Sequence, residues 1–140
     1  MQHNTGTSRD RPLTTLAVLM GLLALSNFWK PAAQRFDPGG SAGFVFFGTR
    51  LQGGANAVMG PLFGLLLAAY AYGVWTMRRW VVPIACIYAA YVIANLALFM
   101  LKAPPADKPS TIGMLVYAAV AIGVSSSGAY YLMRHRDRLR

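Results

Sequence analysis

Four long apolar stretches alternate with polar segments along this chain. They cover residues 13–28, 55–77, 81–101 and 112–133, and none of them contains Asp, Glu, Lys, Arg or His. A helix needs about 20 mainly apolar residues to cross the hydrocarbon core of a bilayer, where every backbone polar group must be bonded internally. The pattern therefore predicts an all-α polytopic membrane protein, a four-transmembrane-helix bundle that forms a single integral membrane domain over residues 1–140.

The polar segments predict how these helices are connected. Only a few residues separate the second and third helices, which must form an antiparallel hairpin, and Pro83 suits the first turn of the third helix. Residues 29–54 form one long outer loop. Within it, Phe44-Val45-Phe46-Phe47 is too apolar for water and too short to span a bilayer. We expect this short interfacial segment to be a piece of helix in the head-group region or against the mouth of the bundle.

The first stretch is short for a crossing, at about 16 residues, and has a second interpretation. It follows Arg9 and Arg11 and ends in Ala24-Leu25-Ser26. A basic start, an apolar middle and a small-residue ending also describe a cleaved signal peptide within residues 1–26. We expect a transmembrane helix, with the signal peptide as the alternative. Both leave the later helices in the same orientation.

Basic residues are distributed unevenly over the two sides of this bundle. The chain has 13 Lys and Arg against four acidic residues, and its formal net charge is +9. The N-terminus, the turn between the second and third helices and the basic tail 134–140 share one side, which carries eight Arg, and the other side carries five Lys and Arg. The positive-inside rule therefore predicts a multi-pass protein of the cell (inner) membrane with both termini in the cytoplasm.

The same positive charge bears on the partners. Basic residues near helix ends attract anionic lipids, so membrane lipids are the first expected partner. We expect head-group contacts from Arg78, Arg79, Arg134, Arg136 and Arg138. No nucleic-acid partner is expected, because the basic residues are scattered over both sides of the membrane.

Small residues recur at four-residue intervals on two of the helices. Such spacing lets two backbones approach closely, which is how helices associate in lipid. The residues concerned are Gly60, Gly64 and Ala68 in the second helix and Ala119, Gly123 and Ser127 in the fourth. We expect these faces to pack within the bundle, and the alternative is a surface for another copy or another subunit. Pro61 should kink the second helix, because it removes a backbone donor.

Polar side chains inside the membrane gather near its outer side. Tyr88, Tyr91 and Asn95 share one face of the third helix, and Asn27 and Asn56 lie near the same outer end. Together they could form a polar layer that opens outward and holds a lipid head group, a quinone-like ring or a small solute. The alternative is a set of interhelical hydrogen bonds, worth roughly 0.6 kcal/mol each on average.

Groups typical of transport, redox chemistry or catalysis are missing from the apolar stretches. Without an intramembrane carboxylate there is no conventional proton-coupling site. His3 and His135 both lie outside the stretches, so a haem held by paired histidines is not expected. Cys86 stands alone, and no metal-ligand cluster, P-loop or catalytic triad is recognisable.

The sequence thus favours a small non-enzymatic membrane protein that acts through helix–helix association, as a homo-oligomer or an accessory subunit of a larger membrane complex. Two alternatives would use the polar face: a small channel or uncoupled carrier, and a lipid- or quinone-binding protein. A third, a lipid-acting enzyme, would use Arg35, Asp37 and Arg50 of the outer loop, which are more simply explained as solvated charges. No cofactor is predicted apart from the lipid or quinone.

Overall fold

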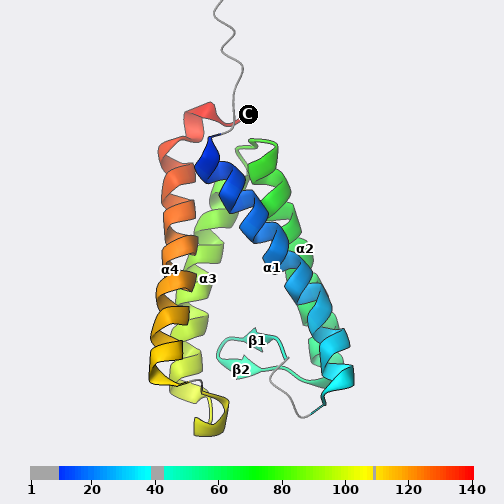
Figure 1. Cartoon of the computed structure of the whole chain (residues 1–140). Helices are drawn as coiled ribbons and strands as arrows, with labels where there is room; N and C mark the ends of the chain where they lie inside the picture. Colours follow the sequence, from blue (N-terminus) through cyan, green and yellow to red (C-terminus); the bar gives the residue numbers. More distant parts are fainter. Residues whose placement is uncertain (1–9, 39–42, 109) are drawn as a thin grey trace, which may run out of the picture.

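Four long helices, arranged as two antiparallel pairs, make up this all-α structure (Figure 1). The structure is a computed structural model, which describes residues 10–38, 43–108 and 110–140. The helices are α1 (Arg11–Phe36), α2 (Gly53–Trp75), α3 (Val81–Lys102) and α4 (Thr111–Arg134). Each is long and apolar enough to cross a membrane, which confirms the predicted set of four membrane-length helices.

The first helix is longer than its apolar stretch. It has 26 residues instead of about 16, begins just before Pro12 and continues through Pro31 to Phe36, so the loop starts at Asp37 and not at residue 29. Pro12 suits the first helical turn. At Pro31 the ring removes one backbone donor, and the carbonyl of Asn27 that this donor would have met lies against Gly60 of α2. Residues 29–36 therefore continue the helix instead of starting the loop.

Small residues of α2 set the distance between α1 and α2. A Cβ added at Gly60 would lie 3.1 Å from the carbonyl oxygen of Asn27, and one added at Gly64 would lie 3.2 Å from the Ala24 carbonyl oxygen and the Phe28 ring. Ala68 packs against the core one turn further on. The two backbones approach closely because these positions have little or no side chain. α2 is helical through Pro61 over its whole length.

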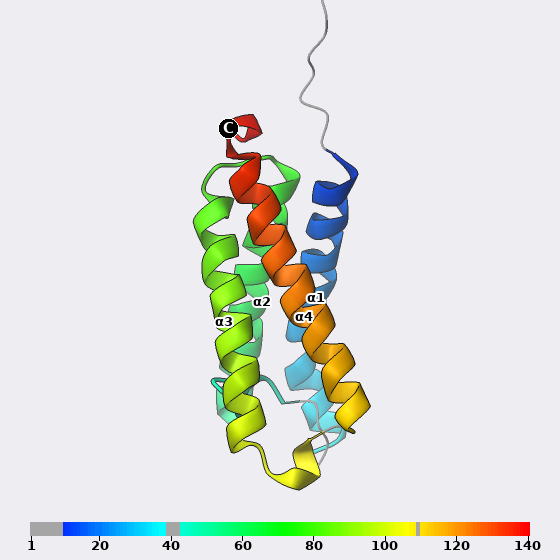
Figure 2. The ribbon, with the colours of Figure 1, turned by 90° about the vertical axis from the view of Figure 1, so that its left-hand side faces the viewer.

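The two pairs converge at one end of the molecule and separate toward the other (Figure 1). We call the first the narrow end; there lie the start of α1, the α2–α3 turn and the C-terminal tail. Its core consists of side chains from all four helices and the tail, including Leu13, Leu16, Met20, Tyr70, Val74, Val81, Leu132 and Leu139. Seen from the side, α3 and α4 lie next to each other in front of the other pair (Figure 2).

The C-terminal tail closes the narrow end. The amide of Arg140 donates to the Met77 carbonyl at 2.7 Å, and the amide of Arg79 donates to the Arg140 carbonyl at 2.8 Å. Leu139, which follows the 3-10 turn η2 (Arg136–Arg138), is only 3% exposed. Asp10, just before α1, accepts hydrogen bonds from Arg138 at 2.8 Å and from Tyr131 at 3.0 Å. The tail therefore joins the start of α1 to the α2–α3 turn.

The arginines expected at lipid head groups all lie at this narrow end and are exposed: Arg78, Arg79, Arg134, Arg136 and Arg138. Two of them also have partners within the protein. Besides the pair of Arg138 with Asp10, the guanidinium of Arg79 donates to the Leu139 carbonyl at 2.9 Å. These two side chains therefore hold the tail in place, and their expected contact with lipid stays a prediction.

A β-hairpin lies between the separated helices at the other end, which we call the wide end (Figure 1). Its strands β1 (Val45–Phe46) and β2 (Thr49–Arg50) are antiparallel, with Val45 opposite Arg50. The expectation of a helix at Phe44–Phe47 is therefore wrong. Phe47 and Gly48 both have positive φ, 44° and 80°. Two such residues form a tight hairpin turn, and the flanking aromatic and β-branched residues favour strands.

Replacing Gly64 by Leu should separate α1 from α2. The new side chain would press on the Ala24 carbonyl and the Phe28 ring, and overpacking of this kind costs roughly 1–3 kcal/mol. Thermal unfolding in detergent should show a lower midpoint for Gly64→Leu. The matched control is Gly21→Leu in α1, where an added Cβ meets nothing within 4 Å. Equal midpoints for the two variants would contradict the role assigned to Gly64.

Candidate functional site

The backbone of the hairpin segment is bonded to side chains of the surrounding helices. On the α2 side, the Oδ1 of Asn56 accepts a hydrogen bond from the amide of Phe44 at 2.8 Å. Its Nδ2 donates to the Oε1 of Gln34 in α1 at 2.7 Å. Asn56 is fully buried. One carboxamide thus links α1, α2 and the hairpin, and it uses both its donor and acceptor sides.

On the opposite side, two residues of α3 hold the hairpin. The Oδ1 of Asn95 accepts from the amide of Gly48 at 3.0 Å, and the hydroxyl of Tyr91 donates to the Val45 carbonyl at 3.2 Å. Gly48 also lies directly on the helix, since an added Cβ would overlap the Leu98 carbonyl group. Polar groups removed from water need such partners, because an unbonded buried amide costs about 1–3 kcal/mol.

Aromatic rings pack beneath the hairpin. The ring of Phe63 in α2 lies 5.0 Å from that of Phe44 and 5.0 Å from that of Tyr91, between centroids. Phe47 meets Tyr91 edge to face at 5.6 Å. Tyr88, one turn before Tyr91, lies 6.2 Å from Phe63. Such tilted and edge-on pairs add to the area that the rings bury. The hairpin therefore packs on a layer of aromatic rings from α2 and α3.

A cavity of about 530 Å³ lies between the two helix pairs, next to the hairpin. All four helices and the hairpin segment contribute to its walls. Most of the lining is apolar, with Leu19, Met20, Leu23, Phe63, Leu67, Val92, Leu96, Phe99, Met114, Val120, Ala121 and Val124. Polar side chains of the lining near the hairpin are Asn27, Lys30, Arg50, Tyr91 and Asn95. The cavity thus has an apolar body and a polar wall at the wide end.

Two cations belong to this polar wall. The ammonium of Lys30 donates to the Oδ1 of Asn27 at 3.0 Å and lies 5.0 Å from the centroid of the Phe44 ring. Asn27 in turn donates to the Leu23 carbonyl in its own helix at 2.8 Å. Arg50 is half-buried and faces the same cavity. None of the described residues that line the cavity is acidic.

The predicted polar face and the cavity coincide only in part. Tyr88, Tyr91 and Asn95 all line the cavity. Asn56 is not among the described lining residues, because the hairpin lies over it and uses its carboxamide. Much of the polarity predicted for a ligand therefore serves the hairpin instead. Of these side chains, Asn56 makes an interhelical hydrogen bond, to Gln34 of α1, whereas Tyr91 and Asn95 bond the hairpin and also line the cavity. That this polar face holds a ligand stays a prediction.

Lys30 and Arg50 were missed as cavity residues. The sequence pattern placed both in the outer loop 29–54 and explained Arg50 as a solvated charge, whereas Lys30 lies in α1 and Arg50 in β2. One signal could have identified Lys30: with the helix extended beyond Phe28, Asn27 and Lys30 are three residues apart and share a face. No comparable signal existed for Arg50. Arg35 and Asp37, grouped with it earlier, are exposed.

The small-residue faces of α2 and α4 have different surroundings. Gly60 and Gly64 are buried against α1. In α4, by contrast, Ala119, Gly123 and Ser127 are exposed, and a Cβ added at Gly123 would meet nothing within 4 Å. The hydroxyl of Ser127 bonds only within its own helix, to the Val124 carbonyl at 3.3 Å. The face of α4 therefore has no neighbour among the described residues.

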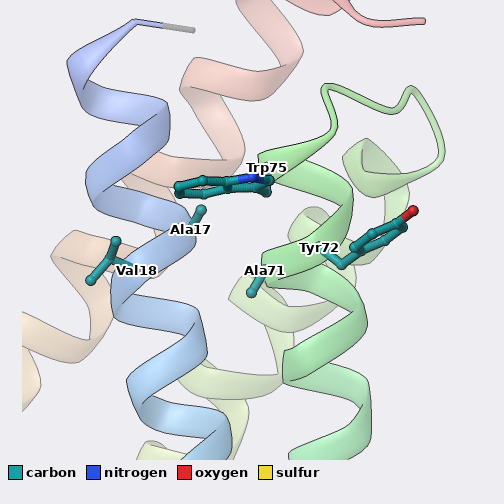
Figure 3. A pocket seen from close by; sticks show the side chains of 5 residues that line it. All are labelled: Ala17, Val18, Ala71, Tyr72 and Trp75. Carbon is teal, nitrogen blue, oxygen red and sulfur yellow. The ribbon is translucent and has the colours of Figure 1, made fainter.

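A second hollow, of about 270 Å³, is a shallow groove on the outside of α1 and α2 (Figure 3). The indole of Trp75 lies across the groove toward Ala17, and Tyr72 points away from α1 (Figure 3). The rest of its lining is Val18 and Ala71. This groove is apolar and open, and it offers few groups that could orient a ligand. Trp and Tyr near the end of an apolar helix are typical of the boundary between lipid and water.

Replacing Asn95 by Leu should loosen the hairpin. The amide of Gly48 would lose its acceptor, at a cost of about 1–3 kcal/mol. Hydrogen exchange over residues 43–51, followed by mass spectrometry, should become roughly tenfold faster or more. Ser127→Ala is the control, because that hydroxyl bonds only to its own helix. Unchanged exchange in Asn95→Leu would show that Asn95 does not hold the hairpin.

No protein-family model, no curated protein and no solved structure matches this chain. A function for the protein therefore has to follow from its own residues and from the form of its cavity.

Proposed function

We propose that this protein is a small, non-enzymatic, multi-pass membrane protein that binds one amphipathic molecule of the bilayer, a lipid or a quinone, between its two helix pairs. The cavity with an apolar body and a polar wall is the observation that carries this proposal. Its volume, about 530 Å³, falls within the roughly 300–1,000 Å³ of typical small-molecule sites.

The form of the lining supports an amphiphile over a polar solute. An alkyl or isoprenoid chain would lie against apolar residues of α1, α3 and α4, among them Leu23, Leu96 and Val120. A head group would meet Lys30, Arg50 and Asn95 near the hairpin. Because the helices are expected to stand in lipid, such a molecule could enter sideways from the bilayer.

The alternative of a channel or carrier has less support. A through path would have to pass the narrow end, where Leu16, Val74, Val81 and Leu132 are buried together and the tail is bonded across the α2–α3 turn. At the wide end the hairpin segment is bonded to both α2 and α3. A continuous core at one end and a bonded hairpin at the other suit retention of a molecule better than conduction.

We also propose that the protein lies in the inner membrane of the cell. Its narrow end would face the cytoplasm. That end carries the described arginines Arg11, Arg78 and Arg79 and the basic tail. An excess of Lys and Arg in short segments next to membrane helices favours the cytoplasmic side. The hairpin and the polar wall of the cavity would then lie toward the outer leaflet.

Filling the cavity should abolish retention of the ligand. Ala121 lines the cavity on α4, and Ala121→Trp would occupy its apolar body. Native mass spectrometry of the mildly extracted protein should show a bound lipid or quinone in the wild type, and at least roughly tenfold less of it in the variant.

The matched control is Ala94→Trp, the same change at an exposed position of α3 outside the described lining. This variant should retain the ligand as the wild type does. A wild-type protein that carries no bilayer molecule, or equal retention by both Trp variants, would contradict the proposal.

A specific observation also favours helix–helix association. The α4 face with Ala119, Gly123 and Ser127 is exposed, and the space over Gly123 is empty within 4 Å. In lipid, such small-residue faces let a second helix approach closely. This face could receive another copy or another subunit without disturbing the cavity, so the two functions are compatible.

Gly123→Leu should weaken that association. Light scattering in mild detergent, or energy transfer between labelled copies in liposomes, should show oligomers for the wild type and a shift toward monomer for the variant. Gly21→Leu in α1 is the control, since it adds the same side chain at another open position. A strictly monomeric wild type that captures no other subunit would rule the association out.

A further inference from the structure

Three residues that line the cavity keep hydrogen-bond donors for a ligand. The Oδ1 of Asn95 accepts from the Gly48 amide at 3.0 Å, whereas its Nδ2 donates to none of the described residues. The hydroxyl of Tyr88, a half-buried side chain, is bonded to none of them either. An ammonium has three donors, and Lys30 gives one of them to Asn27 at 3.0 Å. A molecule in the cavity could therefore accept hydrogen bonds from all three residues.

The three donors are distributed over two helices and two depths. Lys30 belongs to α1, whereas Tyr88 and Asn95 belong to α3. Asn95 lies at the hairpin, and Tyr88 lies seven residues closer to the narrow end, which is about 10 Å along a helix axis. A plain alkyl chain at that depth would leave the Tyr88 hydroxyl without a partner, and a polar group removed from water needs one. The ligand should therefore carry two acceptors that lie apart from each other.

Aromatic rings surround the space between these donors. They come from α2, α3, α4 and the hairpin segment, and they are Phe44, Phe63, Tyr88, Tyr91, Phe99 and Tyr117. Aromatic rings prefer offset or edge-on partners, because their faces and edges carry opposite partial charge. A flat conjugated ring therefore fits this part of the cavity better than a saturated head group does.

The size of the cavity also limits the ligand. A volume of about 530 Å³ suits one drug-sized group, such as a substituted ring with the first units of its chain. A glycerol with two acyl chains and a phosphate head is larger. The rest of a single chain could leave between α1 and α4, where the lining residues Leu23 and Val120 are 40% and 59% exposed. These two helices separate toward the wide end (Figure 1).

We propose that the molecule held in this cavity is a quinone with an isoprenoid chain. One carbonyl oxygen accepts from Lys30 and Asn95 near the hairpin, and the other accepts from the hydroxyl of Tyr88. The inference rests on the proposed function and names the chemical class of its ligand. A quinone carries two acceptors on opposite edges of one flat ring, which matches both the separated donors and the aromatic lining.

The test compares two probes with the same alkyl chain. The full chain is placed in phosphatidylcholine nanodiscs that contain equal amounts of decylubiquinone and decylbenzene, and the retained molecules are measured by native mass spectrometry. The ring of decylbenzene has no oxygen acceptor. The wild type should retain decylubiquinone about tenfold or more over decylbenzene, because only the quinone gains hydrogen bonds from the wall.

Tyr88→Phe isolates the deeper donor, since it removes the hydroxyl and keeps the ring. It should lower retention of decylubiquinone roughly threefold to tenfold and leave that of decylbenzene unchanged. Tyr130→Phe is the matched control, because Tyr130 is exposed on α4 and lies outside the described lining. Equal retention of decylubiquinone by Tyr88→Phe and the wild type would overturn the inference.

Lys30→Met tests the donor on α1. It should lower retention of decylubiquinone by a similar factor and leave that of decylbenzene unchanged. Because the Lys30 ammonium also lies over the Phe44 ring, the substitution could act through the hairpin instead. In that case retention of both probes should fall equally and hydrogen exchange over residues 43–51 should become faster, which would contradict the assignment of Lys30 to a carbonyl oxygen.

The identity of the retained molecule separates this inference from the proposed function. Retention of phosphatidylcholine without decylubiquinone, lost in Ala121→Trp, would overturn the inference and leave the proposed function intact. Equal wild-type retention of decylubiquinone and decylbenzene, also lost in Ala121→Trp, would do the same. A wild-type protein that retains none of the three molecules would overturn both.

Discussion

The structure depends on one requirement: a strand pair placed among long apolar helices must find partners for its outward-facing backbone groups. Three side chains supply them. Asn56 accepts from the amide of Phe44, Asn95 accepts from the amide of Gly48, and Tyr91 donates to the carbonyl of Val45. Irregular backbone at membrane depth is tolerated only where protein or water satisfies it. These bonds therefore decide that the hairpin can lie between the helix pairs.

The cavity results from the hairpin at the wide end together with the bonded C-terminal tail at the narrow end. Asp10 binds Arg138 of the tail and Arg79 binds the Leu139 carbonyl at the narrow end, where the core of the two pairs is continuous. At the wide end the hairpin occupies the space in which α1 and α2 would otherwise meet α3 and α4. Held together at one end and spaced apart at the other, the pairs leave a volume with apolar walls, and the hairpin adds its polar boundary.

The absence of charge over four stretches was enough to predict the helices, because crossing hydrocarbon imposes a length and an apolar composition. Close packing at Gly60 and Gly64 was also accessible, since a four-residue period is a local property. The hairpin was not. The apolar composition of Phe44–Phe47 fits a helix as well as a strand. Its conformation depends on the hydrogen bond from the next residue, Gly48, to Asn95, which lies 47 residues further along the chain.

The candidate site shows the same limit. Tyr88, Tyr91 and Asn95 could be identified because helical spacing places them on one face. Arg50 could not, because its place on the cavity wall depends on the hairpin's register. Lys30 could be identified by its spacing from Asn27 only once α1 is known to extend beyond Phe28. The contact between Asp10 and Arg138 joins residues 128 positions apart, and no local pattern marks such a pair.

The most direct test of this account is a solid-state NMR measurement on the wild-type protein in lipid bilayers, which detects whether the amide of Gly48 and the carboxamide of Asn95 are close. The account predicts a through-space correlation between these two groups and slow exchange of the Gly48 amide with water. A Gly48 amide that exchanges freely and shows no correlation with Asn95 would contradict it, because the hairpin turn would then not be held on α3 and the cavity would lose part of its polar wall.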